Sequence, residues 1–121
     1  MPNVHMLVAD DDPVLGKIVQ GELRSYGYDV QVVENGEDAI SQVRQHDFAV
    51  AVLDIRMPKV DGFGVLKFIK REKPATKVIM LTAYADLRHA AMSQEGGADE
   101  FLTKPYDLEM LRIAIESLAP K

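Results

Sequence analysis

The apolar residues of the chain follow two alternating spacings along almost its whole length. Short runs in which nearly every residue is apolar are typical of buried strands, and stretches with apolar residues three or four apart are typical of amphipathic helices. The runs predict five strands, over Val4–Ala9, Tyr28–Val33, Phe48–Asp54, Lys77–Ala83 and Glu100–Lys104. A stretch with helical spacing follows each run, so the pattern predicts five strand–helix units.

The first helical stretch shows how the predicted helices begin and end. Its apolar residues, which predict one buried face, are Leu15, Ile18, Val19, Leu23 and Tyr26. Asp12 and Pro13 form a typical helix start, and Gly27 is a typical end. The other helices are predicted to begin at Asn35, to span Gly62–Arg71, to run from Asp86 to about Gln94, and to follow a cap at Asp107.

The strict alternation of strands and helices predicts a parallel sheet with right-handed crossovers and helices on both faces. The first, third and fourth runs are apolar throughout, as central parallel strands are, whereas the second contains Gln31 and suits a sheet edge. We therefore predict an α/β fold, a doubly wound five-stranded parallel sheet in the order 2-1-3-4-5 with five helices (flavodoxin-like). The 121 residues are the usual length of one domain, so we expect a single domain over residues 1–121.

Composition and charge exclude several kinds of site and partner. The chain has no cysteine, which excludes disulfides and thiolate metal ligands and fits a reducing cytoplasm, where we expect the protein. No run approaches the roughly 20 apolar residues of a membrane span, and the first residues lack the basic leader of a signal peptide. The net charge of −5 argues against direct binding to nucleic acid or an anionic membrane.

Chemically active residues gather where the predicted strands end. The first strand is followed by Asp10 and Asp11, the third ends on Asp54, the fourth reaches Thr82, and the fifth ends on Lys104. Because the carboxyl ends of parallel strands share one edge of the sheet, these side chains should meet there. Each residue alone has an ordinary structural explanation, but four strand ends with matching chemistry together predict a site.

Carboxylates placed this close together repel each other unless a cation lies between them. An oxygen-only site without cysteine suits Mg²⁺ or Mn²⁺ better than zinc. A metal held by these acids, with Lys104 and Thr82, would form a pocket for a phosphoryl group, and Asp54 is a candidate acceptor because a carboxylate can form an aspartyl phosphate. Asp12 is most simply a helix cap, and Asp61 most simply part of a turn that leads into a helix.

Five segments carry a resemblance to a known family. They are LVADDDP (Leu7–Pro13), LDIRMPKVDG (Leu53–Gly62), MLTA (Met80–Ala83), GGADEFLTKP (Gly96–Pro105) and the capped last helix. In this order and at this spacing they resemble the receiver domain of response regulators in two-component signalling, whose fold is that of the chemotaxis regulator. The resemblance covers the chain from about Val4 to Leu118 and is highly specific.

The resemblance implies a role for each residue of the site. Asp54 would accept a phosphoryl group from a phosphohistidine of a sensor histidine kinase or a phosphotransfer protein. Asp11 would bind Mg²⁺ directly, Asp10 would assist partly through water, and the backbone carbonyl of Arg56 would complete the protein ligands. Lys104 would contact a phosphoryl oxygen.

The resemblance also implies a switch on the other side of the acceptor. The hydroxyl of Thr82 and the N–H of Ala83 would contact the phosphoryl group, and Lys104-Pro105 would be a cis peptide. Thr82 would move toward the phosphate, and Phe101 would turn inward behind it. A tyrosine is frequent in the family at the position of Phe101, so the hydroxyl is missing here, and Phe101 as a simple core residue is an equally good interpretation.

The implied output is a change in the surface formed by the helix from Asp86, the strand Glu100–Lys104 and the last helix. This surface would regulate an effector domain or partner protein, or pair two phosphorylated copies of the chain. The helix from Asp86 is poor in large apolar residues, and such weak anchoring suits an element that shifts. Arg56 and Tyr84 would overhang the site and slow autodephosphorylation by shielding it from water.

The sequence therefore predicts a phosphoacceptor signalling domain rather than an enzyme that acts on a separate substrate. A Mg²⁺-dependent phosphatase with an aspartyl nucleophile is an alternative, but such enzymes carry a second Asp where this chain has Arg56. An FMN carrier would share the fold, but the acidic segment DDDP does not suit a flavin phosphate. A receiver that binds partners without phosphorylation is a third alternative, against which the complete set of site residues argues.

Overall fold

The computed structural model describes residues 4–83, 87–104 and 108–119. The strands are β1 (His5–Ala9), β2 (Asp29–Val33), β3 (Val50–Asp54), β4 (Lys77–Thr82) and β5 (Glu100–Thr103). The helices are α1 (Pro13–Ser25), α2 (Gly36–Gln45), α3 (Gly62–Glu72), α4 (Leu87–Glu95) and α5 (Leu108–Leu118). Strands and helices alternate along the chain as the apolar pattern predicts.

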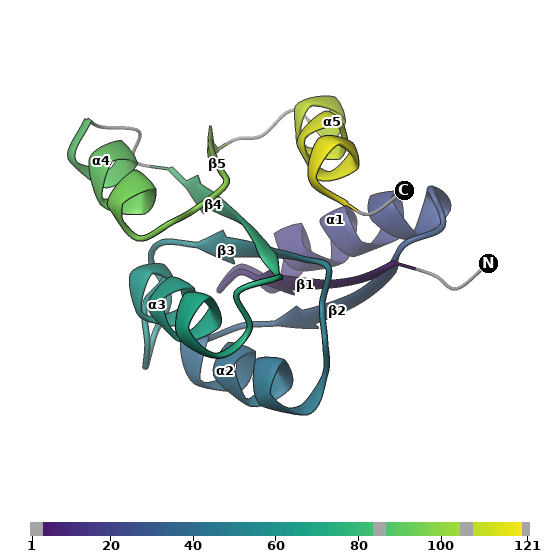
Figure 1. The fold of residues 1–121 in the computed structure, drawn as a ribbon. Helices are drawn as coiled ribbons and strands as arrows, with labels where there is room; N and C mark the ends of the chain where they lie inside the picture. Colours follow the sequence, from purple (N-terminus) through teal and green to yellow (C-terminus); the bar gives the residue numbers. More distant parts are fainter. Residues whose placement is uncertain (1–3, 84–86, 105–107, 120–121) are drawn as a thin grey trace.

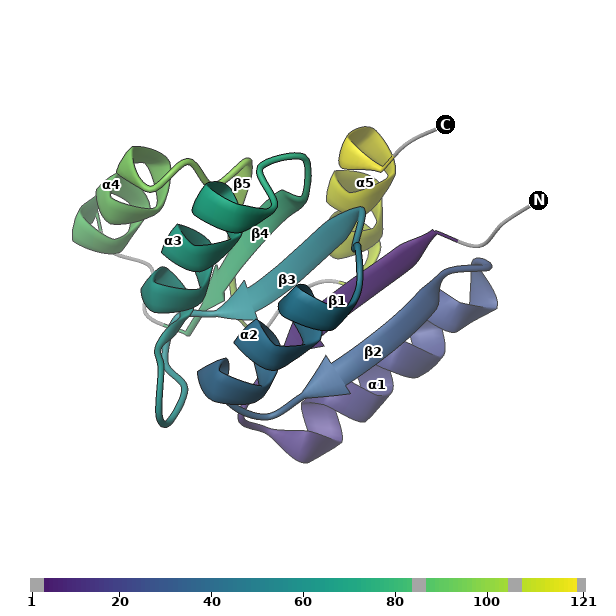
Figure 2. The same ribbon diagram turned by 60° about the horizontal axis from the view of Figure 1, so that its bottom comes forward.

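The five strands of the described residues form one sheet in the order β2-β1-β3-β4-β5, with every neighbouring pair parallel. Helices α2 and α3 cover one face of this sheet and α1 and α5 cover the other, while α4 lies beside the β5 edge (Figures 1 and 2). The predicted α/β fold, strand order and five helices are confirmed. The order places β1, β3 and β4 in the centre, where their continuous apolar runs are buried on both faces.

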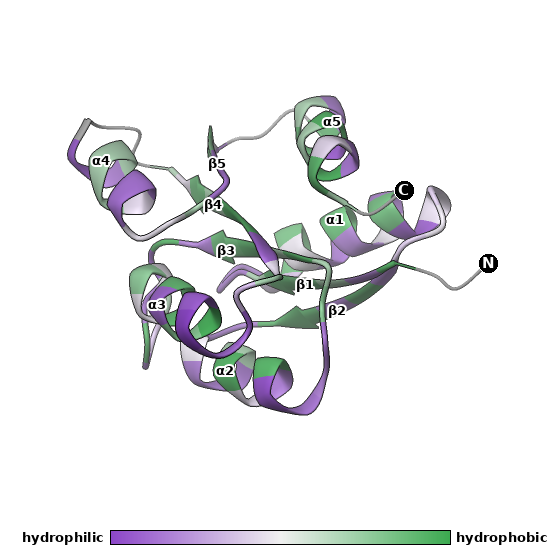
Figure 3. Ribbon diagram, in the orientation of Figure 1, coloured by the Kyte–Doolittle hydropathy of each residue, from purple (hydrophilic) through white to green (hydrophobic). Residues whose placement is uncertain are grey.

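Two apolar clusters fill the spaces between the sheet and its helices. Leu7, Leu53 and Leu66 belong to the cluster under α2 and α3, and Val8 and Leu111 belong to the cluster under α1 and α5. Figure 3 shows hydrophobic residues along the strands and mixed hydrophobic and hydrophilic residues around the helices. Leu7 and Val8 enter different clusters because successive side chains of a strand point to opposite faces.

The predicted buried face of α1 is partly wrong. Ile18 is 51% exposed and Tyr26 is 50% exposed, whereas the buried residues of α1 are Gly16, Val19 and Leu23. The apolar residues of this helix cover more of its circumference than one stripe, and only one stripe can face the sheet. Val14 and Ile18 are therefore left facing solvent, and Leu15 is half-buried.

The helix starts agree with the sequence prediction, and the strand boundaries differ from it by one or two residues. The side chains of Asp12, Asn35 and Asp61 cap α1, α2 and α3. Gly27 follows α1 with a φ of +92°, a backbone conformation that favours glycine. The predicted caps of the last two helices, Asp86 and Asp107, lie outside the described residues. Among the described residues, none of the helices has the length and apolarity that crossing a bilayer requires.

Candidate functional site

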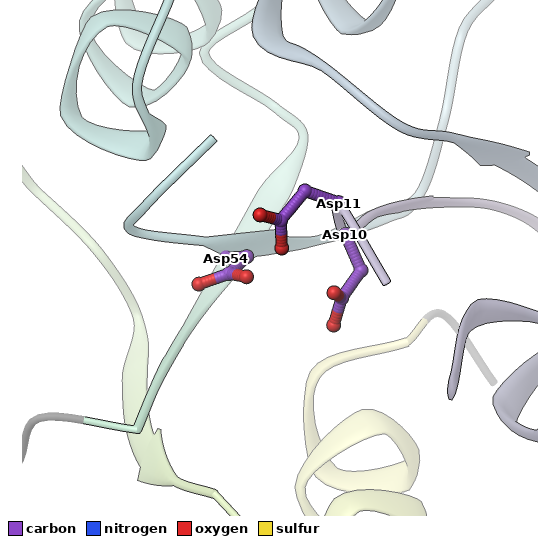
Figure 4. Close-up of side chains that lie close together, drawn as sticks. All are labelled: Asp10, Asp11 and Asp54. Atoms are coloured by element: carbon purple, nitrogen blue, oxygen red, sulfur yellow. The ribbon is translucent and has the colours of Figure 1, made fainter. Parts of the chain in front are cut away.

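The ends of β1 and β3 bring three carboxylates together. Asp10 and Asp11 follow the last residue of β1, and Asp54 is the last residue of the neighbouring strand β3. Figure 4 shows the three side chains at this edge of the sheet. Asp10 is 1% exposed and Asp54 is 5% exposed, whereas Asp11 is exposed to solvent. The predicted meeting of these acids at the sheet edge is therefore present in the structure.

The three acids have the geometry and chemistry of a site for a hard cation. Each offers one carboxylate oxygen, and these oxygens lie within 4.8 Å of one another. Oδ2 of the buried Asp10 lacks a well-formed hydrogen bond, and the ammonium of Lys104 lies beside it at 2.8 Å. An all-oxygen donor set suits Mg²⁺ or Mn²⁺, and the residues fit the cation that the sequence predicts.

Lys104 is held between two of these carboxylates. Its Nζ lies 2.8 Å from Oδ2 of Asp10 and 2.9 Å from Oδ2 of Asp54, to which it donates a hydrogen bond. The backbone N–H of Lys104 donates to the carbonyl of Thr82 at 2.7 Å, which fixes the start of the lysine side chain beside the end of β4. One ammonium faces three carboxyl groups, so a bound cation would further stabilise the site.

The protein environment raises the pKa of both Asp54 and Lys104. Burial raises the pKa of Asp54, Lys104 and the backbone N–H of Arg56 lower it in part, and the neighbouring Asp10 raises it further. Burial alone would lower the pKa of Lys104, but its contacts with Asp10 and Asp54 outweigh burial and raise that pKa. Lys104 therefore stays positively charged at neutral pH, where it can neutralise an anion.

The nearby acids Asp12 and Asp61 have structural partners, as their ordinary interpretation predicts. Oδ1 of Asp12 accepts from the N–H groups of Val14 and Leu15 at 3.0 and 3.2 Å. Oδ1 of Asp61 accepts from the N–H of Gly64 at 2.9 Å. These bonds satisfy the free donors at the first turns of α1 and α3, so both residues are helix caps rather than members of the acidic cluster.

A pocket of about 310 Å³ opens over the end of β3. Its lining residues are Asp11, Asp12, Leu15, Asp54, Arg56, Thr82, Ala83 and Lys104. Thr82 is buried, whereas Arg56 and Ala83 are exposed at the rim. Of the residues that the sequence associates with a phosphoryl group, Tyr84 and Pro105 lie outside the described residues.

A second, larger pocket adjoins the first and is not predicted by the sequence. It has a volume of about 530 Å³ and shares Asp11 and Arg56 with the pocket over Asp54. Its further lining residues are Ile55, Met57, Asp61, Phe63, Arg88, His89 and Met92. Because its far wall is α4, its existence depends on how that helix sits beside α3, which spacing along the sequence does not specify.

Hydrogen bonds hold the loop between β3 and α3 beside Asp54. The N–H of Ile55 donates to the carbonyl of Leu81 at 2.9 Å, which ties the start of the loop to β4. The N–H of Arg56 donates to Oδ1 of Asp54 at 3.2 Å. The N–H of Gly62 donates back to the carbonyl of Ile55 at 2.8 Å and closes the loop. The first and last residues of the loop are thus fixed directly after Asp54.

Phe101 lies at the β5 edge with its side chain half-buried. It packs against the cluster under α2 and α3 and also lines a pocket of about 330 Å³ with residues of α4, among them Ala90 and Ser93. A ring that is anchored on one side and borders free space on the other is compatible with a core role and with a switch. Both interpretations of Phe101 therefore remain.

Comparisons with known proteins agree with this arrangement. The family model described as response regulator receiver domain matches residues 6–116. The transcriptional regulatory protein ZraR of Escherichia coli (strain K12) is 38% identical over 114 residues, which cover 94% of this chain and 26% of ZraR. The transcriptional regulatory protein TcrA of Mycobacterium tuberculosis is 34% identical over 116 residues, which cover 96% of this chain and 46% of TcrA. The chain thus spans about a quarter to a half of the length of these curated relatives.

A solved structure matches the fold over nearly the whole chain. The crystal structure of a CheY-like response regulator receiver domain protein from Methanospirillum hungatei JF-1 is similar with a TM-score of 0.92 and 27% sequence identity. The match covers 96% of this chain and 93% of that one. Family match and fold therefore agree over the same residues.

Proposed function

The chain belongs to the family of response regulator receiver domains of two-component signalling, and on this premise we propose that Asp54 is its phosphoacceptor. A sensor histidine kinase or a phosphotransfer protein donates the phosphoryl group from a phosphohistidine, and the reaction depends on Mg²⁺. The observation that carries the proposal is the buried carboxylate of Asp54 at the end of a central strand, 2.9 Å from the ammonium of Lys104.

The transfer forms one bond and breaks one. A carboxylate oxygen of Asp54 attacks the phosphorus atom, the bond from phosphorus to the imidazole nitrogen of the donor breaks, and the leaving imidazole takes up a proton. Such a reaction asks the protein mainly for positioning and for stabilisation of negative charge. The rigid end of β3 positions the nucleophile, and Lys104 supplies a fixed positive charge beside it.

Asp11 and Asp54 are the direct protein ligands of Mg²⁺, Asp10 acts partly through water, and the carbonyl of Arg56 completes the set. Mg²⁺, or Mn²⁺ in its place, supplies neutralisation of the acids and of the phosphoryl oxygens when it is bound. The cluster of Asp10, Asp11 and Asp54, whose oxygens lie within 4.8 Å of one another, supports this assignment.

The pocket over Asp54 has the lining that a phosphoryl group requires. Lys104 contacts one phosphoryl oxygen, and the hydroxyl of Thr82 and the N–H of Ala83 contact the others, all three residues being part of the pocket lining. When the dianionic phosphoryl group is present, Lys104 contacts it in place of Asp10. This change of partner alters the forces on the end of β5, where Lys104 lies.

The output is a change in the surface of α4, β5 and α5. Thr82 moves toward the phosphoryl group and Phe101 follows into the space behind it, which the pocket beside Phe101 supports. The loose seating of α4, whose only fully buried described side chain is Ser93, supports a helix that shifts at small cost. This surface regulates an effector domain or a partner protein, or pairs two phosphorylated copies of the chain.

Arg56 and Tyr84 limit the access of water to the aspartyl phosphate. Arg56 lines both pockets beside Asp54, where a long side chain can cover the phosphoryl group. Autodephosphorylation is therefore slow. The chain is a signalling domain of the cytoplasm that catalyses its own phosphorylation and dephosphorylation and acts on no separate substrate.

The test is phosphorylation by a small acyl phosphate with Mg²⁺, followed by intact mass spectrometry. The expected result is a gain of one phosphoryl group that disappears with a chelator and in Asp54→Asn. Asp47→Asn, which removes an exposed acid far from the site, is the matched control and should gain the same mass. An unmodified wild-type protein, or equal modification of Asp54→Asn, would contradict the proposal.

A further inference from the structure

Val60 is wedged between the first turns of two helices. It lies near the end of the loop between β3 and α3, half-buried against the cluster under α2 and α3. On one side is Gly36, the first residue of α2, where a Cβ atom would lie 1.8 Å from the carbonyl oxygen of Val60. On the other side is Gly64 of α3, where a Cβ atom would lie 2.6 Å from Cγ1 of Val60.

The two glycines differ in what a methyl group would meet. At Gly64 the obstacle is the end of a side chain, which can rotate away. At Gly36 the obstacles are the carbonyl oxygen and carbon of Val60, at 1.8 and 2.6 Å, so the backbone of the loop itself would have to move. The N–H of Gly36 also points to the carbonyl of Pro58 at 3.4 Å. Glycine is needed at position 36 because the loop approaches the helix too closely for any side chain.

This contact acts on the loop that carries the site. The base of the loop is fixed by Ile55 and Gly62, and its N–H at Arg56 donates to Oδ1 of Asp54. The approach of Pro58 and Val60 to Gly36 fixes the far part of the same loop against α2. A shift of Val60 by the width of a methyl group would therefore displace the Arg56 backbone in the same loop. The displaced Arg56 N–H would in turn reorient the Asp54 carboxylate, to which it donates.

We propose that Gly36 is a positioning residue of the Asp54 site, which holds the loop between β3 and α3 in the geometry that binds the cation and accepts the phosphoryl group. The part that concerns the phosphoryl group rests on the proposed function, whereas the part that concerns the cation does not. Residues that orient metal ligands typically change metal affinity by about 10–100-fold when they are replaced. Gly36 touches neither the cation nor the substrate and acts through the backbone of Val60.

The test is the Mg²⁺ affinity of Gly36→Ala, measured by calorimetric titration with Mg²⁺ alone well below the unfolding temperature. The expected result is a Kd at least about tenfold higher than that of the wild type. Gly21→Ala in α1 is the matched glycine control because a Cβ atom there has no neighbour within 4 Å, and Val30→Ala is the control for lost core packing on the opposite face of the sheet. Both controls should keep the wild-type Kd.

Two further variants keep the test decisive if Gly36→Ala does not fold. Gly64→Ala should weaken Mg²⁺ binding less, and Val60→Ala added to Gly64→Ala should restore it, because only a side chain stands in the way there. An unchanged Kd for Mg²⁺ in a folded Gly36→Ala would overturn the proposal. An equally large rise in Kd in Val30→Ala would also overturn it. So would a raised Kd in Gly64→Ala that the added Val60→Ala does not lower. If the wild type binds Mg²⁺ but accepts no phosphoryl group, the proposed function fails while these comparisons still hold.

Discussion

The ammonium nitrogen of Lys104 lies 2.9 Å from Oδ2 of Asp54, fifty positions away in the sequence, and 2.8 Å from Oδ2 of Asp10. The lysine thus occupies the position of an internal counter-ion for two buried acids. Because a phosphoryl group on Asp54 brings two negative charges to the same place, the same ammonium is already positioned for the phosphorylated state.

Lys104→Met is expected to destabilise the metal-free protein. It leaves Asp10 and Asp54 without their shared cation, and breaking a buried ion pair by removing one partner typically costs about 3 kcal/mol or more. Urea denaturation at neutral pH measures the loss, which Mg²⁺ should partly reverse because it neutralises the same acids. Lys67→Met, on the exposed side of α3, is the control and should change the unfolding free energy by less than about 0.5 kcal/mol.

Asp54→Asn is expected to stabilise the metal-free protein at neutral pH. Burial raises the pKa of Asp54, so the folded state holds its proton more tightly than the unfolded chain does. Stability therefore falls as the pH rises from the unfolded carboxyl pKa of about 4 to the raised folded pKa, and the full cost remains at higher pH. Denaturation curves across this range should show a gain for Asp54→Asn that shrinks as the pH falls. A gain that is independent of pH would contradict this origin.

Asp11 and Asp12 should separate into a metal ligand and a helix cap. Asp11→Ala should raise the Kd for Mg²⁺ by at least about tenfold and leave the metal-free stability almost unchanged. Asp12→Ala should cost about 1 kcal/mol of stability by removing the cap of α1 and should leave the Kd near the wild-type value. Calorimetric titration and thermal unfolding of both variants give the two quantities. A raised Kd in Asp12→Ala together with a loss of stability in Asp11→Ala would contradict the assigned roles.

Mg²⁺ itself should stabilise the wild type through binding to the folded state. At a concentration of about 100 times its Kd, the expected gain in unfolding free energy is about 2.7 kcal/mol. The gain should be smaller in Asp11→Ala at the same concentration. Equal stabilisation of both proteins would place the cation somewhere other than the acidic cluster.

Arg56→Ala should shorten the life of the phosphorylated protein severalfold. The Arg56 side chain lines the pocket over Asp54, and its removal opens a path for water to the phosphorus atom. The decay of the phosphorylated mass after removal of the donor measures the lifetime. Lys59→Ala, in the same loop but outside the lining of that pocket, is the control and should decay at the wild-type rate. A wild-type lifetime for Arg56→Ala would rule out shielding by this side chain.

The fold could be predicted because its decisive signals are local. The apolar runs that end on Asp54 and Thr82 have the composition of central strands, and the single Gln31 distinguishes the edge strand β2, where it is exposed. Strand order then follows from the rules of parallel sheets. The proximity of the acidic residues could be predicted because the strand order alone decides which strand ends are neighbours.

Other features depend on packing that the sequence pattern does not contain. The exposure of Ile18 depends on the rotation of α1 about its own axis. The pocket lined by Arg88 and His89 depends on the position of α4 relative to α3. The need for glycine at position 36 depends on the approach of Val60, which lies far along the chain. Such contacts are set by three-dimensional shape rather than by spacing.

The residue that carries the phosphoryl group decides whether Asp54 is the phosphoacceptor. Treatment of the phosphorylated protein with borohydride reduces an aspartyl phosphate to homoserine and so marks the modified residue, which peptide mass spectrometry then locates. We expect the mark on Asp54 alone, with none in protein that was treated without Mg²⁺. A mark on Asp10 or Asp11 in place of Asp54, or no mark on any acid of a protein that has gained the mass, would contradict it.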